Sequence, residues 1–269
     1  MTENHAANAA LAVIKIGGSI LTSSAAFRRA AAFLRDRHRA SPRERMVVVV
    51  SAQEGATDSL ERAARRIAAI PDPLALDLLW STGELRSVAL LTLHLQSLGV
   101  RTAALNVHEA GLLAPQRGCG SGAVQLNPRR LQSALRDCPI AIVPGFLAID
   151  PAGAVVSLGR GGSDLTAVLL AAGLRACRCE LIKDVPGYFS SDPHQDASAR
   201  HLPELTFQQA LALADLGCDL VQRKAIEAAA GAALPLVIRS LNDAAPLTRI
   251  TAPEQLPAFA GSLSAAATP

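Results

Sequence analysis

The sequence predicts an α/β protein, a three-layer αβα sandwich around a mostly parallel central sheet. Short β-rich runs alternate with helical segments along the chain, which is the order that successive βαβ units produce. One run, Met46–Val50, is apolar throughout, as in a strand that is buried on both faces. Half of the 269 residues are hydrophobic, which is enough to cover such a sheet with helices on both sides.

Composition excludes several classes of function. The net charge is only +3 and aromatic residues make up 3% of the chain, too few for a nucleic-acid surface that stacks bases. Residues 1–10 contain Glu3 and no basic stretch, so no signal peptide is predicted. The most apolar segment, Leu165–Leu174, is too short to span a bilayer. We therefore expect a cytoplasmic protein with small-molecule partners, no nucleic-acid or membrane partner, and reduced cysteines.

Strands and helices alternate through the first half of the chain, separated by glycine, proline or polar turns. Strands are predicted at 11–16, 46–50, 100–105 and 140–143. Helices are predicted at 24–39, after the polar loop 51–58, at 81–98 and at 128–136. The long helix is expected to begin at Ser81-Thr82-Gly83-Glu84 and to stop before Gly99.

The second half repeats this alternation within a single predicted domain, residues 11–250. Strands are predicted at 154–158, 180–183 and 234–238, helices at 165–173, 207–216 and 223–230, and an irregular loop at 184–201. Residues 251–269 are rich in Ala, Pro and Ser and, like residues 1–10, are expected to form a flexible tail.

Two glycine-rich turns carry the candidate chemistry, because each lies between a strand and a helix. Backbone N–H groups at a helix N-terminus bind anions well, and glycine lets them approach closely. Gly17-Gly18 follows Lys15, and the run 159–164 (GRGGSD) contains Arg160, so each turn has one basic side chain. Taken singly, Gly17-Gly18 also suits a plain structural turn, and Asp164 suits a helix N-cap. Together the two turns predict a phosphate-transfer cleft, without any Walker A motif.

Lysine is rare in this chain. Only three of the 26 basic residues are lysines: Lys15, Lys183 and Lys224. A compact ammonium suits a phosphate-binding role that a planar guanidinium does not fill, and chance is the alternative explanation.

Several motifs resemble those of aspartokinases. Residues 15–19 (KIGGS) resemble their K-F-G-G-S start, and residues 158–166 (LGRGGSDLT) match their L-G-R-G-G-S-D-x-T signature. Other segments are similar to their serine loop, G-E helix, A-G-F turn and nucleotide loop: 49–58, 81–84, 144–146 and 184–193. Since order and spacing hold from about residue 11 to 243, the chain is identified as a member of the amino-acid kinase superfamily, aspartokinase branch.

The resemblance implies a fold, an activity and cofactors. It implies the amino-acid kinase fold, with a substrate-binding lobe at about 11–155 and a nucleotide-binding lobe at about 156–250. It also implies transfer of phosphate from ATP, with Mg²⁺, to the side-chain carboxylate of aspartate, in a homodimer without metal-ligating side chains. Aspartokinases typically continue into paired ACT modules, and this chain ends about where the linker would begin. The resemblance therefore implies a catalytic domain without ACT-based feedback control by lysine or threonine.

The resemblance also assigns roles to individual residues. Lys15 would neutralise the phosphates of ATP, and Asp164 would orient Lys15 rather than act as a base. The transferred phosphoryl group would be held by Gly17, Gly18, Ser19, Gly161, Gly162 and Ser163. The acceptor would be bound by Ser51, Thr57, Glu84 and Arg160, with Glu84 on its ammonium and Arg160 on its α-carboxylate. The nucleotide would be bound by Lys183, Asp184, Phe189, His194 and Lys224. A plain position in the first turn of a helix remains the alternative for Glu84.

Some positions depart from the family pattern. Asp219 stands where the family has a lysine in G-[AS]-K, Lys183 where it commonly has threonine, and His194 where it has arginine in D-P-R. Gln53-Glu54 adds a carboxylate near the serine loop. These departures leave two alternatives open. The acceptor would be another small carboxylate or a phosphomonoester, or the chain would be a non-catalytic, nucleotide-binding regulatory subunit.

Overall fold

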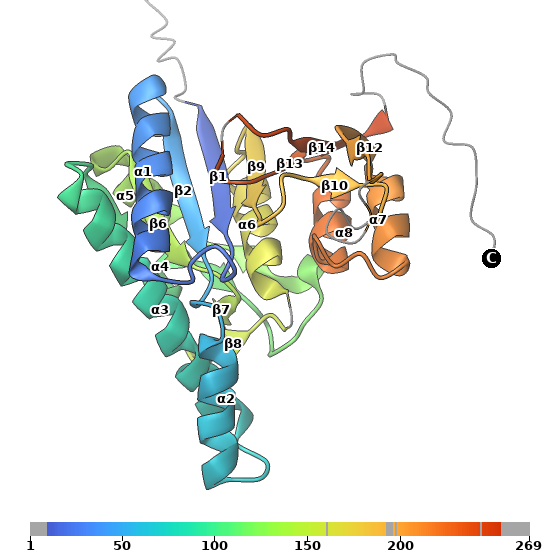
Figure 1. Cartoon of the computed structure of the whole chain (residues 1–269). Coiled ribbons are helices and arrows are strands. Elements are labelled where there is room, and N and C mark those ends of the chain that lie inside the picture. Colours follow the sequence, from blue (N-terminus) through green and yellow to red (C-terminus); the bar gives the residue numbers. More distant parts are fainter. Residues whose placement is uncertain (1–9, 160, 192–195, 197, 243, 254–269) are drawn as a thin grey trace, which may run out of the picture.

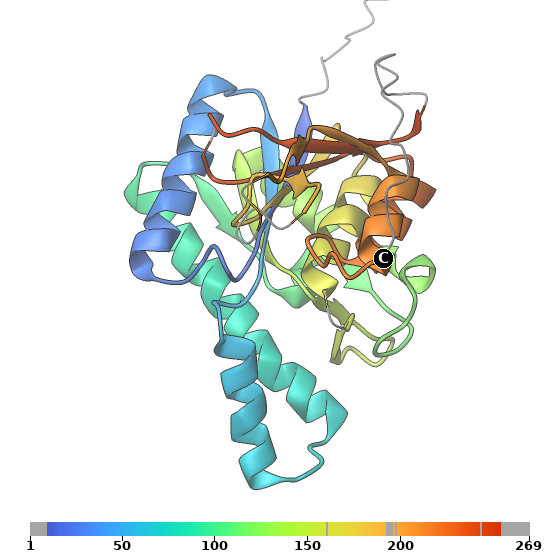
Figure 2. The ribbon, with the colours of Figure 1, turned by 45° about the vertical axis from the view of Figure 1, so that its right-hand side comes forward.

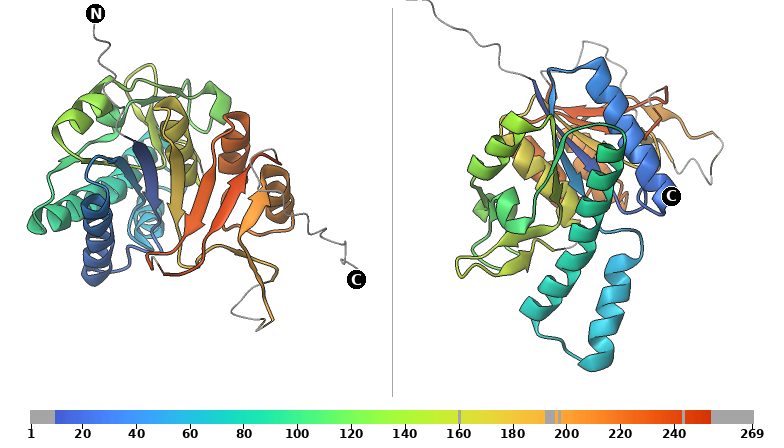
Figure 3. Two further views of the ribbon diagram at one scale, coloured as in Figure 1. Left: turned by 90° about the horizontal axis from the view of Figure 1, so that it is seen from above. Right: turned by 90° about the vertical axis from the view of Figure 1, so that its left-hand side faces the viewer.

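A three-layer arrangement is present in the computed structural model, which describes residues 10–159, 161–191, 196, 198–242 and 244–253. An eight-stranded sheet forms the middle layer, and helices cover both of its faces (Figures 1 and 3). The predicted fold class is therefore confirmed.

Parallel pairing dominates the central sheet. Its strand order is β12-β14-β13-β9-β1-β2-β6-β3. The bounds in that order are Glu204–Thr206, Thr248–Thr251, Leu236–Arg239, Arg178–Ile182, Leu11–Ile16, Arg45–Val50, Ile140–Pro144 and Thr102–Ala104. Only the β13–β14 pair is antiparallel among the described pairs of this sheet.

Successive side chains along each strand point to opposite faces of the sheet and contribute to two hydrophobic cores. On β1 and β2, Val13 and Val47 belong to the core on one face, whereas Ile14 and Val48 belong to the core on the other. The first core is covered by α5, α6, α7 and α8, at Arg129–Asp137, Gly162–Gly173, Phe207–Asp215 and Arg223–Gly231. The second is covered by α1 and α3, at Ser24–Ala40 and Pro73–Ser97. Continuous apolar strands are thus buried on both faces.

Helix α2 (Ala56–Ile67) and the first half of α3 form a hairpin that projects beyond the sheet (Figures 1 and 2). No residue of α2 is buried. Smaller elements complete the fold: α4 at Val107–Ala110, a 3₁₀ turn at Ser121–Ala123, β10–β11 at Tyr188–Phe189 and His201–Leu202, and a sheet of β5, β4, β7 and β8 at Gln125–Leu126, Leu112–Leu113, Leu147–Ile149 and Val155–Ser157. No helix in the described part of the chain is both long and apolar enough to cross a membrane.

The predicted start of the long helix at Ser81 is wrong. Helix α3 begins at Pro73, where Asp72 caps it by accepting a 2.8 Å hydrogen bond from the Ala75 amide. Proline is favourable at the first helical position because its missing N–H would have no partner there. Glu84 consequently lies in the helix interior, which removes the first-turn alternative for this residue.

The start of α6 also differs from the prediction. The helix begins at Gly162 rather than at residue 165, and Gly161 occupies the N-cap position with a φ of 74°. Asp164 is therefore in the first turn of the helix and is not its N-cap. Two short pairings, β10–β11 and β12–β14, arise in segments where no strand was predicted.

Parallel strands bring the ends of β1, β2, β6 and β9 to one edge of the sheet. Ile16 is opposite Val50 on one side and Ile182 on the other. Lys15 near the end of β1, Ser51 after β2 and Lys183 after β9 therefore meet at this edge.

The opposite edge contains a buried ion cluster. Glu180, on β9, accepts two hydrogen bonds of 2.6 Å from the guanidinium of Arg37 and one of 2.6 Å from Arg178. Glu44 pairs with the same two arginines. Burial would raise the pKa of Glu180, but these arginines hold the pKa below its usual value.

Replacing Glu180 with alanine is expected to destabilise the fold by about 3–5 kcal/mol, because it leaves buried guanidinium charge without its partner. Urea unfolding measures the free energy of unfolding. The matched control is Glu227→Ala, which removes an exposed 2.9 Å pair with Arg223 and should cost less than about 1 kcal/mol. Equal losses in the two variants would contradict this role of the cluster.

Candidate active site

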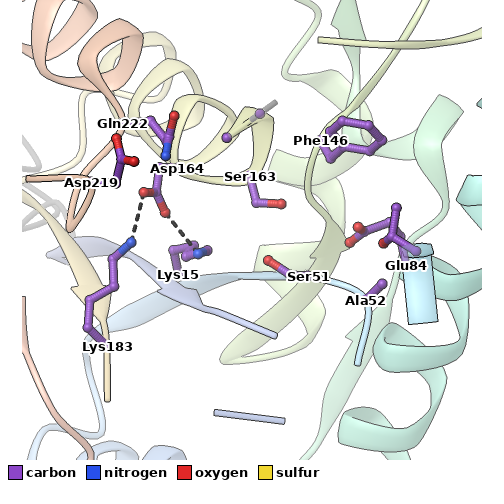
Figure 4. A pocket seen from close by; sticks show the side chains of 13 residues that line it. Lys15, Ser51, Ala52, Glu84, Phe146, Ser163, Asp164, Lys183, Asp219 and Gln222 are labelled. Carbon is purple, nitrogen blue, oxygen red and sulfur yellow. Dashed lines mark hydrogen bonds and ion pairs between the residues drawn. The ribbon is translucent and has the colours of Figure 1, made fainter. Parts of the chain in front are cut away.

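A cavity of about 290 Å³ lies at the edge where β1, β2 and β9 end (Figure 4). Its walls come from the end of β1, the segments after β2, β6 and β9, the glycine turn before α6, the starts of α2 and α6, the middle of α3, and the α7–α8 connection. The lining residues are Lys15, Ser51, Ala52, Thr57, Glu84, Phe146, Gly161, Gly162, Ser163, Asp164, Lys183, Asp219 and Gln222.

Asp164 lies between two lysines at one end of the cavity. The ammonium of Lys15 is 2.8 Å from Oδ1 of Asp164, and the ammonium of Lys183 is 2.8 Å from Oδ2 (Figure 4). All three side chains are largely buried. The two lysines thus share the carboxylate of Asp164 between them, and the side chain of Asp219 lines the same end of the cavity.

The pKa values of these groups follow from burial and charge. Burial would raise the pKa of Asp164, but Lys15 and Lys183 together lower it to about 2, so the carboxylate is ionised at neutral pH. Burial also lowers the pKa of Lys183; the charge of Lys15 lowers it further, while Asp164 opposes both effects.

Glycine is required where the turns approach their neighbours. A Cβ on Gly18 would lie 2.6 Å from the Ala52 carbonyl oxygen, and one on Gly161 would lie 2.1 Å from Cγ of Gln222. A side chain at either position would force the walls of the cavity apart. The Gly162 amide donates a 3.0 Å hydrogen bond to the Gly159 carbonyl. This amide, which was predicted to donate a hydrogen bond to the phosphoryl group, therefore already has a partner within the turn.

Glu84 lies at the other end of the cavity, beside Phe146 (Figure 4). Its Oε2 is buried and has no hydrogen-bond partner among the described residues. Burial raises the pKa of Glu84 to about 8, against the opposing effects of the Ala52 backbone and Lys15. Ser51 and Ser163 lie between the two ends. The cavity therefore has one end that contains two lysines and another end that contains a protonated carboxyl group.

Most of the predicted site residues meet in this cavity. Gly17 and Gly18 adjoin it, since a Cβ on Gly17 would lie 3.1 Å from Nζ of Lys15. Six predicted residues that the structure describes are not on its wall: Gly17, Gly18, Ser19, Asp184, Phe189 and Lys224. Phe189 instead packs edge-on against His201, with ring centroids 5.3 Å apart. Arg160 and His194 lie outside the described residues.

Four wall residues were not assigned to the site from sequence. Phe146 was noticed only within a turn motif, and its φ of 70° places its ring against the cavity. Asp219 was noticed only as a departure from the family pattern. Ala52 belongs to the serine-loop motif but has no side-chain chemistry that would indicate a site, and Gln222 lies in no recognised motif. Gln222 meets the glycine turn only through the packing of α8 against α6.

Comparisons with known proteins agree on one family. A model of the amino acid kinase family matches residues 10–240. An aspartokinase of Geobacillus stearothermophilus is 37% identical over 195 residues, which are 72% of this chain and 48% of that protein. Aspartate kinase Ask_LysC of Stutzerimonas stutzeri (strain A1501) is 35% identical over 210 residues, 78% of this chain and 51% of that protein. The chain thus spans about half the length of these relatives.

Solved structures agree with the fold. An aspartate kinase from Synechocystis aligns with a TM-score of 0.79 at 34% identity, covering 91% of this chain and 40% of that one. A uridylate kinase from Archaeoglobus fulgidus aligns with a TM-score of 0.65 at 18% identity, covering 89% and 99%. The second similarity concerns the fold alone.

The buried carboxyl group of Glu84 should make stability depend on pH. Its pKa is about 8 in the folded chain against 4.5 for the free group, so the folded protein retains a proton that the unfolded chain has lost. The free energy of unfolding should therefore fall as the pH rises through this window, by at most about 1.4 kcal/mol per pH unit, and level off above it. Urea unfolding of the wild type and Glu84→Gln from about pH 5 to pH 9 measures the difference. Parallel curves for the two proteins would contradict the burial effect.

Proposed function

Because this chain belongs to the amino acid kinase family, we propose that it transfers the γ-phosphoryl group of ATP to the side-chain carboxylate of aspartate. The observation that carries the proposal is a cavity with Asp164 and two lysines at one end and Glu84 at the other. Relatives that are about 35% identical and are named aspartokinases support this acceptor.

The end of the cavity that contains the two lysines suits the phosphates of ATP. Phosphoryl transfer needs positioning and charge stabilisation more than covalent chemistry by the protein. Lys15 and Lys183 would neutralise charge on the transferred group and on the leaving oxygen, and Asp164 would hold both ammonium groups in place. An oxygen of the acceptor carboxylate attacks the γ-phosphorus, the bond to the bridging oxygen breaks, and ADP leaves. No base is required, because an ionised carboxylate has no proton to lose.

Mg²⁺ would bind mainly through the phosphate oxygens. Among the described residues, no group of three or more His, Cys, Asp or Glu side chains is arranged to hold a metal ion. When bound, Mg²⁺ would supply additional charge neutralisation on the phosphates. The α6 N-terminus and the two lysines provide the protein's own share of that stabilisation.

The acceptor would bind at the Glu84 end. Glu84 is protonated at neutral pH in the ligand-free chain, and the ammonium of aspartate would favour its ionised form. Ser51 and Thr57, also on the wall, would donate hydrogen bonds to the acceptor. Arg160 is retained as the predicted partner of the α-carboxylate. The homodimeric state and the cytoplasmic location stay predictions.

The function is tested by incubating the full chain with MgATP and a panel of acceptors: aspartate, glutamate, other small dicarboxylates and phosphomonoesters. ADP release is followed by a coupled assay, and hydroxylamine traps any acyl phosphate as a hydroxamate. We expect release of ADP and hydroxamate formation with aspartate. ADP release with another acceptor but none with aspartate would contradict the proposed acceptor, and release with none would contradict the kinase activity.

Replacing Lys15 with alanine is expected to keep the fold and to lower turnover by at least about 100-fold, because transition-state charge is stabilised largely by fixed cations. Asp164 would retain Lys183 as a partner, so the buried carboxylate stays paired. Steady-state kinetics and thermal unfolding measure the two effects. The control is Arg130→Ala, which removes an exposed residue that pairs with Glu109 on the surface. A folded Lys15→Ala protein with wild-type turnover would contradict the assignment.

The ammonium group of Lys183 should be replaceable by one introduced on another wall of the same cavity. Lys183→Thr is expected to weaken ATP binding and lower turnover by about 10–100-fold, since one of two phosphate-binding cations is lost. Asp219 lines the same cavity from the α7–α8 connection, so Lys183→Thr combined with Asp219→Lys restores an ammonium there. We expect the double variant to recover at least about tenfold in turnover over Lys183→Thr.

Calorimetric titration with ATP and with AMP distinguishes the loss of a phosphate-binding charge from a general structural defect in these variants. Loss of ATP affinity with unchanged AMP affinity is the expected result for Lys183→Thr. Equal losses for ATP and AMP, or a double variant no better than the single one, would show that Lys183 acts only on the structure.

A further inference from the structure

A second cavity, of about 450 Å³, adjoins the one that contains the lysines. Thr57, Phe146 and Gly161 line both, so the two cavities share a wall at the Glu84 end of the site. The remaining walls of the second cavity are Asp58, Glu61, Trp80, Arg117, Gly118, Ser157 and Gly159. The proposed function assigns no role to this space.

Arg117 is the only cationic side chain among the described walls of the second cavity, and it is firmly held. Its Nε donates a 2.8 Å hydrogen bond to Oδ2 of Asp77. The same oxygen accepts a 2.9 Å bond from the Ser157 amide, and Asp77 is fully buried. A buried carboxylate strongly favours a conformation in which its cation stays near it. Asp77 therefore fixes the guanidinium at the cavity wall.

An aromatic contact fixes the plane of the same guanidinium. The carbon at its centre lies 5.7 Å from the ring centroid of Trp80, a cation–π distance. The Trp80 ring packs against Phe146, with centroids 5.6 Å apart. A continuous series of contacts thus runs from Asp77 through Arg117 and Trp80 to Phe146, which faces the reaction cavity.

The two terminal amino groups of Arg117 have no hydrogen-bond partner in the described part of the chain. The side chain is 40% exposed. A guanidinium with a fixed plane and free amino groups matches a carboxylate, which accepts two parallel hydrogen bonds. Asp58 and Glu61, on the α2 wall, repel anions, so a bound carboxylate would be confined to the Arg117 side.

Helix α3 relates this site to the reaction cavity. Asp77 and Glu84 are seven residues apart on the same helix, and Trp80 lies four residues before Glu84, so all three fall on one face. The face that presents Glu84 to the first cavity therefore also holds Arg117 at the second. An acceptor that reached past Phe146 and Thr57 would contact both groups.

We propose that Arg117 binds the carboxylate of the acceptor that is not phosphorylated, so that the acceptor spans both cavities. This inference rests on the proposed function, and it adds Arg117 to Arg160, which the sequence predicts as a partner of the same carboxylate. The ligand class is an amino acid with two carboxylates, one phosphorylated and one held by Arg117. Asp77 and Trp80 are positioning residues, which act by fixing the guanidinium.

The test compares aspartate with its α-amide, in which the non-reacting carboxylate is replaced by a neutral group. The ratio of kcat/KM for the two acceptors is measured in the wild type, Arg117→Gln and Arg117→Lys. Because it is a ratio, it does not depend on the fraction of correctly folded protein. We expect Arg117→Gln to reduce the preference for aspartate at least about tenfold, and Arg117→Lys, which keeps the charge but loses the planar fork, to reduce it less.

Two further measurements separate recognition from structure. The KM for ATP should be unchanged in all variants, and Arg130→Gln, at an exposed surface pair, should leave the preference unchanged. Arg117→Gln combined with Asp77→Asn removes the buried charge as well, so it tests the same loss of preference if the single variant unfolds.

The outcomes distinguish this inference from the proposed function. An unchanged preference in folded Arg117 variants would overturn the role of Arg117 and leave aspartate phosphorylation standing. Equal losses for both acceptors would show a purely structural role. If the wild type phosphorylates neither acceptor, the proposed function fails, and calorimetric titration with aspartate then decides the inference. Binding that Arg117→Gln weakens at least tenfold supports it, and unchanged or absent binding overturns it.

Discussion

The candidate site depends on the ion pairs that the carboxylate of Asp164 makes with Lys15 and Lys183. The carboxylate holds two buried ammonium groups, each 2.8 Å away, which would otherwise repel one another in a poorly solvated space. Three elements meet there: β1 brings Lys15, the end of β9 brings Lys183, and the first turn of α6 brings Asp164. The parallel pairing of β1 with β9 sets the spacing of the lysines, and Gly161 sets the start of the helix.

Buried charges are paired differently at the two ends of the parallel strands. At one edge, Glu44 and Glu180 are paired with Arg37 and Arg178, so the charges are satisfied and contribute to stability. At the other edge, two lysines share one carboxylate, and Glu84 retains an oxygen without a partner among the described residues. An unsatisfied polar group is costly in a folded chain, and the position of Glu84 Oε2 in a cavity that also contains two lysines supports a ligand site there.

Helix α3 connects the hydrophobic core with the Glu84 end of the cavity. Its second half, including Val88, Leu91 and Leu95, packs into the core beneath the sheet. That packing sets the position of Glu84, because Glu84 lies one helical turn before Val88 on the same face of α3. A long helix anchored in the core thus positions acidic and aromatic side chains at the cavities without contributing a flexible loop.

Local sequence patterns predict the layers, the central sheet and the residues at the lysine end of the cavity, whereas the rest of the cavity wall forms only when distant segments of the chain pack together. Apolar strands and glycine turns are local patterns, which is why the sequence predicts a common site for Lys15, Gly161 and Asp164, and all three line one cavity. The start of α3 was missed because Pro73 marks both linkers and helix starts, and only the cap by Asp72 distinguishes them. Gln222 and the Asp77–Arg117 pair, whose members are 40 residues apart, carry no local signal. Such contacts form only when distant segments pack together. Sequence patterns, by contrast, indicate only the local structure around each residue.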